Sequence, residues 1–119
     1  MQYLLLIYDE GDVASRMSEA ERGAMMRDYG SFTEELKAAG KMLAGDALQP
    51  VATATSVRIR DGRTVMTDGP FAETKEHLGG YYLIEADDLD EATAWAGKIP
   101  TAKWGTIEVR PIFDWSKAG

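Results

Sequence analysis

Two helix-start signals, one near each end of the chain, constrain the fold more than any other feature of the sequence. Ser18 to Glu21 forms a capping box, in which the serine hydroxyl accepts the backbone N–H of Glu21 and the glutamate carboxylate accepts the N–H of Ser18. Asp88, with Glu91 at the third helical position, repeats the signal. Two helices therefore start at defined positions, and the remaining segments have to supply the strands that they cover.

The spacing of apolar residues sets the extent of each helix. The first is predicted over residues 19–39, with Gly40 as its left-handed C-cap, and the second ends before Pro100. The two apolar faces consist of Met25, Tyr29, Phe32, Leu36 and Ala39, and of Leu89, Ala92, Trp95, Ala96 and Ile99. Gly23 and Gly30 each cost roughly 1 kcal/mol relative to alanine, so either the first helix is weakened or a neighbour approaches closely there.

Strand-like segments surround both helices. Leu4–Tyr8 is a continuous apolar run typical of a central strand covered on both faces. Residues 42–48 predict a second strand that ends near Pro50, and Tyr81–Ala86 a further one from its aromatic and β-branched content. Thr106–Phe113 alternates between apolar and polar residues, which predicts a half-exposed final strand.

Asp61-Gly62 marks the clearest hairpin in the chain. This pair is favoured by the two-residue type I′ turn, and strand-like segments 56–60 and 63–67 flank it. The resulting register gives the hairpin one apolar side, made by Val57, Ile59, Thr64 and Met66, and directs Arg58 and Arg60 away from it.

The order strand, helix, strand, hairpin, strand, helix, strand predicts an α+β fold of ferredoxin-like, split β-α-β type. Two helices then cover one face of an antiparallel sheet, in a single domain spanning residues 1–119. The other sheet face needs a cover, and we expect a homodimer. The residues that look too apolar for open water on that face are Tyr3, Tyr81 or Tyr82, Leu83 and Ile112.

Composition excludes several classes of function. The net charge is −7 and the basic residues are scattered, so direct nucleic-acid binding is not expected. The chain has no cysteine, which excludes thiolate nucleophiles and thiolate metal sites. The apolar run at the start is too short for a signal-peptide core or a membrane span, so we expect a cytoplasmic protein without a membrane partner.

The segment "DGPFAETKEH", residues 68–77, is the strongest candidate site. Its first half has a structural explanation as a turn, in which Asp68 accepts backbone N–H groups, Pro70 fixes φ and Phe71 anchors the loop in the core. Its second half concentrates ionisable groups. In an extended segment Glu73, Lys75 and His77 share one side, and Thr74 and Glu76 the other.

These groups are candidates for acid–base catalysis, with a solvated, salt-bridged loop as the alternative. The catalytic candidates are Asp68, Glu73, Lys75 and His77, and the ligand-binding candidates are Tyr8, Phe71, Glu76 and Arg110. Arg110 can hold a carboxylate bidentately, which suits a small polar or anionic ligand, although a structural ion pair is the alternative. No cofactor fingerprint is present, and a single histidine without fixed ligand spacing predicts no metal site.

The stretch "DGPFAETKEHLGGYYLIEADDLDEA", followed by "VRPI", resembles the YCII-related family and within it the DGPF-motif branch. The resemblance implies a dimeric α/β barrel built from two ferredoxin-like subunits. Members of the branch can occur beside or fused to alternative sigma factors, so it implies either a small-molecule enzyme or a non-catalytic ligand-binding or accessory module linked to transcription. The His–Asp pair suggested for the wider family is not matched here, because His77 lies inside the motif tail.

Overall fold

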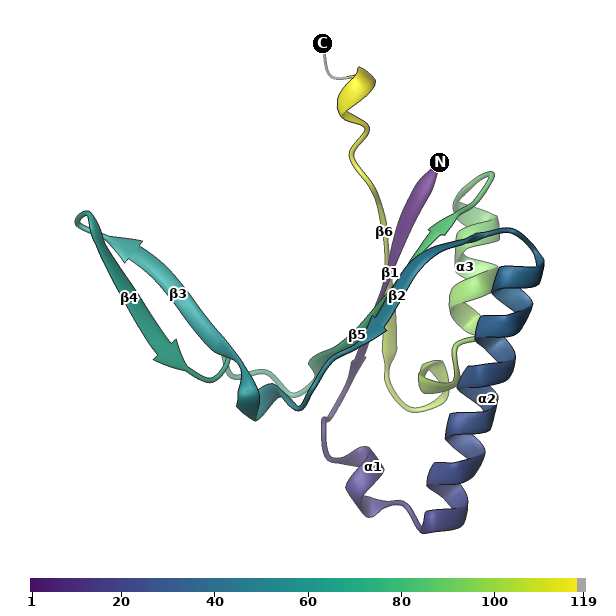
Figure 1. Cartoon of the computed structure of the whole chain (residues 1–119), viewed down its shortest axis with the longest axis horizontal. Coiled ribbons are helices and arrows are strands. Elements are labelled where there is room, and N and C mark those ends of the chain that lie inside the picture. Colours follow the sequence, from purple (N-terminus) through teal and green to yellow (C-terminus); the bar gives the residue numbers. More distant parts are fainter. Residues whose placement is uncertain (118–119) are drawn as a thin grey trace.

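Four strands form the main sheet in the order β2-β5-β1-β6, and every neighbouring pair is antiparallel (Figure 1). The computed structural model describes residues 1–117. The strands of this sheet are β1 (Gln2–Asp9), β2 (Met42–Ala47), β5 (His77–Glu85) and β6 (Thr106–Pro111). This order, with a helix between β1 and β2 and another between β5 and β6, is compatible with the predicted ferredoxin-like fold.

The two long helices begin where their capping signals predicted. They are α2 (Glu19–Ala38) and α3 (Leu89–Gly97); shorter turns are α1 (Val13–Arg16), η1 (Val51–Thr53), η2 (Pro100–Lys103) and η3 (Trp115–Lys117). The capping box is present, with both of its hydrogen bonds at 3.1 Å. Gly40 adopts φ +71° after the end of α2, as its C-cap role requires. None of the helices within residues 1–117 is long and apolar enough to span a membrane.

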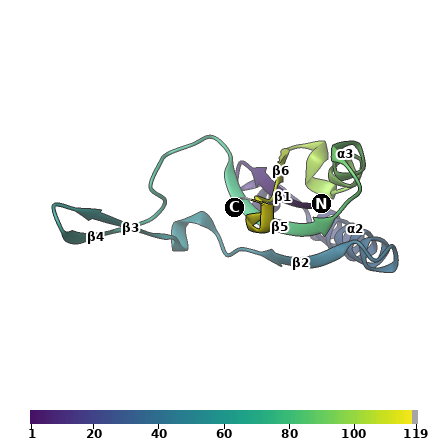
Figure 2. The same ribbon diagram turned by 90° about the horizontal axis from the view of Figure 1, so that it is seen from above.

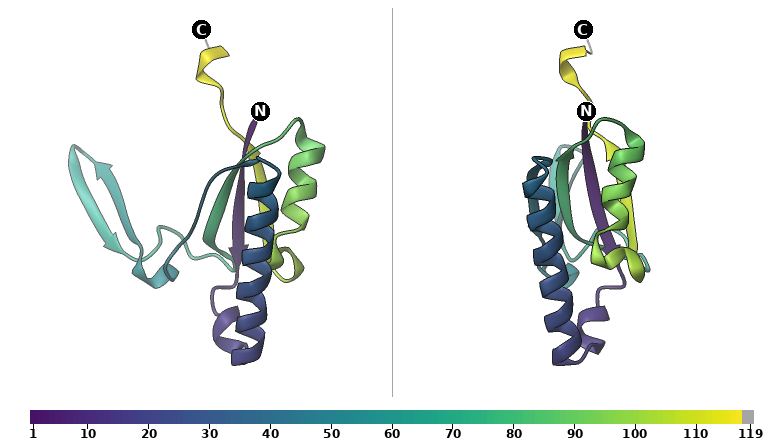
Figure 3. Two further views of the ribbon diagram at one scale, coloured as in Figure 1. Left: turned by 45° about the vertical axis from the view of Figure 1, so that its right-hand side comes forward. Right: turned by 90° about the vertical axis from the view of Figure 1, so that its right-hand side faces the viewer.

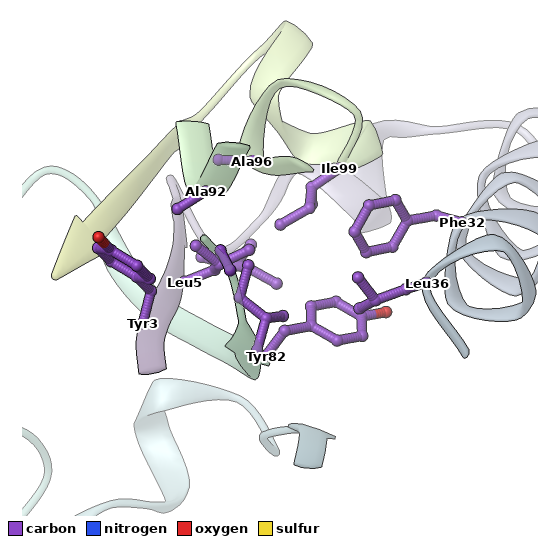
Figure 4. Packing of buried hydrophobic residues seen from close by; sticks show 11 residues of the cluster. Tyr3, Leu5, Phe32, Leu36, Tyr82, Ala92, Ala96 and Ile99 are labelled. Carbon is purple, nitrogen blue, oxygen red and sulfur yellow. The ribbon is translucent and has the colours of Figure 1, made fainter. Parts of the chain in front are cut away.

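The core lies between the helices and one face of the main sheet (Figure 4). Leu5 and Ile84 from the sheet and Leu36 from α2 are fully buried there. The Phe32 ring meets the Tyr82 ring edge-on, with centroids 5.1 Å apart. Because α2 and α3 cover only this face, the chain by itself has a single core layer.

The opposite sheet face, which we call the open face, is not covered by any helix or strand of residues 1–117. Strand alternation places the side chains of Leu4 and Leu6 from β1 and of Tyr81 and Leu83 from β5 there, all partly exposed. Tyr3, predicted for this face, is instead in the core, as is Tyr82, the alternative to Tyr81. β1 is central in the order of the sheet, but only one of its faces is covered within the chain.

The hairpin forms a separate two-stranded sheet, β3 (Thr55–Arg60) with β4 (Arg63–Asp68), which we call the arm. Asp61 and Gly62 have φ of 52° and 75°, as a type I′ turn requires. The predicted register is confirmed, since Val57 lies opposite Met66 and Ile59 opposite Thr64. Figures 2 and 3 show that the arm stands away from the main sheet, on the side opposite the helices.

Several predicted details need correction. Leu89 was placed on the buried face of its helix but is 51% exposed. The last strand ends at Pro111, so Phe113 lies beyond it and is 62% exposed. β5 begins at His77, earlier than the predicted Tyr81, because the residues before Tyr81 pair with β1.

Candidate functional site

A hollow of about 620 Å³ lies where the arm joins the end of the main sheet. We call it the junction hollow. It is lined by Tyr8, Leu48, Gln49, Pro50, Val51, Thr53, Ala54, Pro70, Phe71, Ala72, Thr74, Glu76, His77 and Leu78. Its walls come from the end of β1, from η1 and the segment before it, and from the loop that leads into β5. Four of the predicted site residues therefore line a single hollow: Tyr8, Phe71, Glu76 and His77.

The first half of the segment "DGPFAETKEH", residues 68–71, forms a turn that closes the base of the arm, as predicted. Gly69 adopts φ +94°, and its N–H donates to the Ala54 carbonyl at 2.6 Å. The Ser56 hydroxyl donates to the Gly69 carbonyl at 2.9 Å. These bonds attach the loop to the start of β3 and so position one wall of the junction hollow.

Phe71 does not anchor this loop in the core, contrary to the prediction. Its side chain is 76% exposed and lines the junction hollow. The core lies on the helix-covered face of the sheet, whereas this loop joins the arm, which stands on the other side. Phe71 is therefore an exposed apolar side chain beside a hollow, where a ligand or another chain can contact it.

The second half of the segment "DGPFAETKEH" supplies the polar residues Thr74, Glu76 and His77 to the lining of the hollow. Glu76 Oε1 accepts a hydrogen bond from the Thr106 hydroxyl of β6 at 2.8 Å. The Thr74 hydroxyl donates to the Glu76 carbonyl at 2.6 Å and lies 3.4 Å from His77 Nδ1. His77 pairs with Asp9 of β1, one residue beyond Tyr8. The loop and two strands thus bring a carboxylate, an imidazole and a phenol to the lining of the same hollow.

The other predicted site residues do not line this hollow. Residues 69–76 form no strand, so the expected grouping of Glu73 and Lys75 with His77 on one side does not arise. Lys75 is 87% exposed, and its Nζ lies 3.9 Å from Glu10 Oε1. Asp68 ends β4 opposite Thr55 and is exposed.

Arg110 lies on β6 opposite Leu4, several residues from the end of the sheet that borders the hollow. Its guanidinium pairs with the Glu108 carboxylate. The structural ion pair, which was the alternative to ligand binding, is therefore the arrangement observed. It leaves Arg110 on the surface of the last strand, away from Glu76 and His77.

The family model of the YCII-related domain matches residues 1–116 of this chain. The chain belongs to the YCII-related domain family. An uncharacterised protein of Rhizobium meliloti (strain 1021) is 40% identical to it over 114 residues, which cover 94% of this chain and 92% of that protein.

A second hollow in this YCII-related chain, of about 820 Å³, lies at the opposite end of the sheet. It is lined by Met1, Gln2, Glu85 and residues 111–117. None of the predicted site residues lies in it, and much of its lining is the exposed segment after β6. The smaller junction hollow is therefore the better candidate, because it combines apolar walls with polar side chains that include Tyr8, Glu76 and His77.

The apolar walls of the junction hollow were missed by sequence reasoning. Leu48, Pro50, Val51 and Ala54 are far along the sequence from Glu76 and His77, and only the fold brings them beside these residues. The signal that could have found some of them is Pro50, which lies beyond the end of β2 at Ala47 and is the N-cap of η1, just before the arm begins. An apolar lining with a few convergent polar groups is typical of small-molecule sites.

Proposed function

We propose that this protein binds a small organic molecule in the junction hollow. The observation that supports the proposal is the composition of the hollow, in which an apolar lining meets Tyr8, Glu76 and His77. Its volume of about 620 Å³ lies within the range of roughly 300–1,000 Å³ usual for ligand sites. The apolar walls would take up the body of the molecule, and the three polar groups would orient it.

The charges in the lining favour a neutral or cationic ligand that donates hydrogen bonds. Glu76 is the single acidic residue among the lining residues, and no lysine or arginine is among them. Arg110, the residue expected to hold a carboxylate, pairs with Glu108, and Lys75 pairs with Glu10; both basic residues lie outside the lining. We therefore propose a small polar ligand, as the sequence predicted, but one that is neutral or positively charged and not anionic.

A fragment screen by nuclear magnetic resonance tests this proposal. His77 is the single histidine, so its ring gives one imidazole signal that needs no assignment by mutation. Neutral, cationic and anionic aromatic fragments are added separately to the wild-type protein. We expect neutral and cationic fragments to shift the His77 signal at lower concentration than anionic ones. A signal that stays unmoved by every fragment would contradict binding at this hollow.

Two neighbouring alanines supply a matched pair of variants. Ala54 lines the hollow, whereas Ala52 lies in the same turn, is exposed and is outside the lining. Ala54→Trp should fill the hollow and abolish the fragment-induced shifts, and Ala52→Trp should leave them as in the wild type. Equal loss in both variants would indicate a general disturbance of η1 and not occupation of the hollow.

Acid–base catalysis on the bound molecule is the second candidate function. It is favoured by the presence of a carboxylate, an imidazole and a phenol in the lining of the same hollow. Each binding fragment is followed by its own spectrum over hours with wild type, His77→Gln and Glu76→Gln. If the wild type converts a fragment and the rate of conversion is at least about tenfold lower in either variant, the result supports catalysis. If the fragments bind but remain intact, the result supports a binding module.

We also propose that the chain forms a homodimer of the α/β barrel type, within the DGPF-motif branch. The support is the open face, where Leu4, Leu6, Tyr81 and Leu83 are only partly covered, and the "DGPF" motif at residues 68–71. Sedimentation analysis of the wild-type protein over a range of concentrations measures the mass directly. A monomer at all concentrations would contradict the dimer without affecting ligand binding.

A further inference from the structure

We propose that the arm is a clasp between two copies of this chain, with its apolar side packed on a second copy that is seated between the arm and the open face. The inference deepens the proposed homodimer and rests on it, because it names the segment that holds the two copies together.

The apolar side of the arm is exposed in the part of the chain that the structure describes. Val57, Ile59 and Met66 are 60%, 59% and 68% exposed. An isolated two-stranded hairpin is marginally stable in water and needs packing against another element. Within the chain the arm is held at its base, where Gly69 bonds to Ala54, and it stands clear of the helix-covered core. Its ordered strands and its apolar side therefore call for a cover from outside the chain.

The surface area indicates how large this cover is. The solvent-accessible surface is 8279 Å², whereas a compact monomer of this mass exposes about 6,400 Å². The radius of gyration, 16.6 Å, likewise exceeds the roughly 13.5 Å of a compact domain of this length. If two copies each bury the excess of about 1,900 Å², the interface totals about 3,800 Å², within the range of permanent homodimers.

The position of the arm identifies where the second copy sits. Figures 1 and 3 show the helices on one side of the sheet and the arm on the other, so the arm and the open face bound one notch. The apolar residues Leu4, Leu6, Tyr81 and Leu83 lie on the open face of this notch. One occupant can therefore cover the open face and the arm together.

Symmetry favours a second copy over an unrelated partner. Each copy has two apolar surfaces that need a cover, the open face and the apolar side of the arm. In a two-fold dimer the arm of each copy packs on the other copy, so a single interface covers both surfaces twice. Arg58 and Arg60 lie on the opposite side of the arm and stay exposed to solvent.

The test compares the masses of two arm variants with that of the wild type by sedimentation. Ile59→Asp places a charge on the apolar side of the arm, and Val65→Asp places the same charge on the opposite side, where Val65 is 45% exposed. We expect Ile59→Asp to weaken dimerisation more than about 30-fold, as loss of a central apolar contact does. Val65→Asp should dimerise as the wild type does, and circular dichroism should show both variants folded.

The outcomes separate the clasp from the dimer itself. A monomeric wild type would overturn both proposals. A dimeric wild type with an equally dimeric Ile59→Asp would overturn the clasp alone, and a dimer broken by Val65→Asp but not by Ile59→Asp would overturn the assignment of the apolar side.

Cross-linking gives a second measurement that does not depend on weakening the dimer. Because the chain has no cysteine, Ile59→Cys introduces one thiol that can carry a photoactivated cross-linker. Copies labelled with nitrogen-15 are mixed with unlabelled copies, and cross-linked peptides are identified by mass. We expect mixed-isotope products joining position 59 to the open face, near Leu4 and Tyr81. Products joining position 59 only within its own copy would overturn the clasp.

Discussion

The main sheet and the arm are both antiparallel and are built from similar apolar residues, yet their environments are opposite. Leu5 and Ile84 in the main sheet are 0% exposed, whereas Val57 and Met66 in the arm are 60% and 68% exposed. Alternation along each strand decides which side of a sheet is apolar. What covers that side is decided elsewhere: by α2 and α3 for the main sheet, and by no segment of residues 1–117 for the arm.

The largest expected difference between the two regions comes from truncating an apolar side chain in each. Leu36 is fully buried under the sheet, so Leu36→Ala should lower the free energy of unfolding by about 2–5 kcal/mol. Ile59→Ala should change it by less than about 0.5 kcal/mol under conditions where the chain is monomeric. Urea denaturation of both variants at low protein concentration measures this. Equal losses would mean that the arm is part of the core's cooperative unit.

Glycine substitutions distinguish the same regions with a smaller effect. A Cβ at Gly105 would lie 2.2 Å from the Tyr8 carbonyl oxygen, so Gly105→Ala forces the backbone apart and should cost about 1–3 kcal/mol. Gly62 in the arm has free space but φ +75°, so Gly62→Ala should strain the turn by about 1–2 kcal/mol.

The two glycine variants need two measurements. Thermal unfolding followed by tryptophan fluorescence, to which Trp95 contributes from its place against the core, should shift for Gly105→Ala and not for Gly62→Ala. Amide exchange in β3 and β4 should quicken for Gly62→Ala alone, because a loosened turn frees the arm without opening the core. A lowered melting temperature for Gly62→Ala would contradict the separation of the two regions.

The features that the sequence predicted well are those that depend on neighbouring residues. Helix starts follow from Ser18 with Glu21 and from Asp88, whose capping bonds close within three residues. The arm follows from Asp61-Gly62, since the turn sets the register. The face of β1 could not be predicted, because Tyr3 and Leu4 are both apolar and only contact with the helices separates them.

The candidate site was predicted in part for the same reason. Glu76 and His77 are adjacent in the sequence, so their joint presence was foreseeable, and Tyr8 was placed correctly at a strand end. The position of Phe71 was predicted wrongly, because the apolar character of a residue does not determine whether its side chain faces the core or a hollow. The lining from residues 48–54 depends on where the chain turns after β2, a distant arrangement that no local pattern encodes.

A third prediction concerns Gly30 of α2, where a substitution should change the free energy of unfolding by a smaller amount. The structure decides between the alternatives left open for Gly30, since no atom of residues 1–117 outside its chain neighbours and the adjacent backbone of α2 would lie within 4 Å of a Cβ there. Gly30→Ala should therefore stabilise the protein by up to about 1 kcal/mol. Gly40→Ala, at φ +71°, should destabilise it instead. The urea concentration at the unfolding midpoint should rise for Gly30→Ala and fall for Gly40→Ala. Shifts in the same direction in both variants would contradict this prediction.

The smallest expected effect is the pH dependence that Glu91 contributes to the helix-covered body. The pKa of its carboxylate is lowered from the ordinary 4.5, first by the backbone N–H of Asp87, which donates to it at 2.8 Å, and then by the Trp95 ring N–H and by Lys41. Because its pKa is lower in the folded state, ionised Glu91 stabilises the fold above about pH 4.5, and this contribution is lost as the pH falls through the lowered value. Glu91→Gln should therefore be less stable than the wild type at pH 7, with the difference shrinking toward pH 3.

Glu34→Gln makes the same change of charge at an exposed position of α2 and serves as the control in urea denaturation at both pH values. A difference between Glu91→Gln and the wild type that stays constant over this range would show that packing, and not the charge of Glu91, carries its effect.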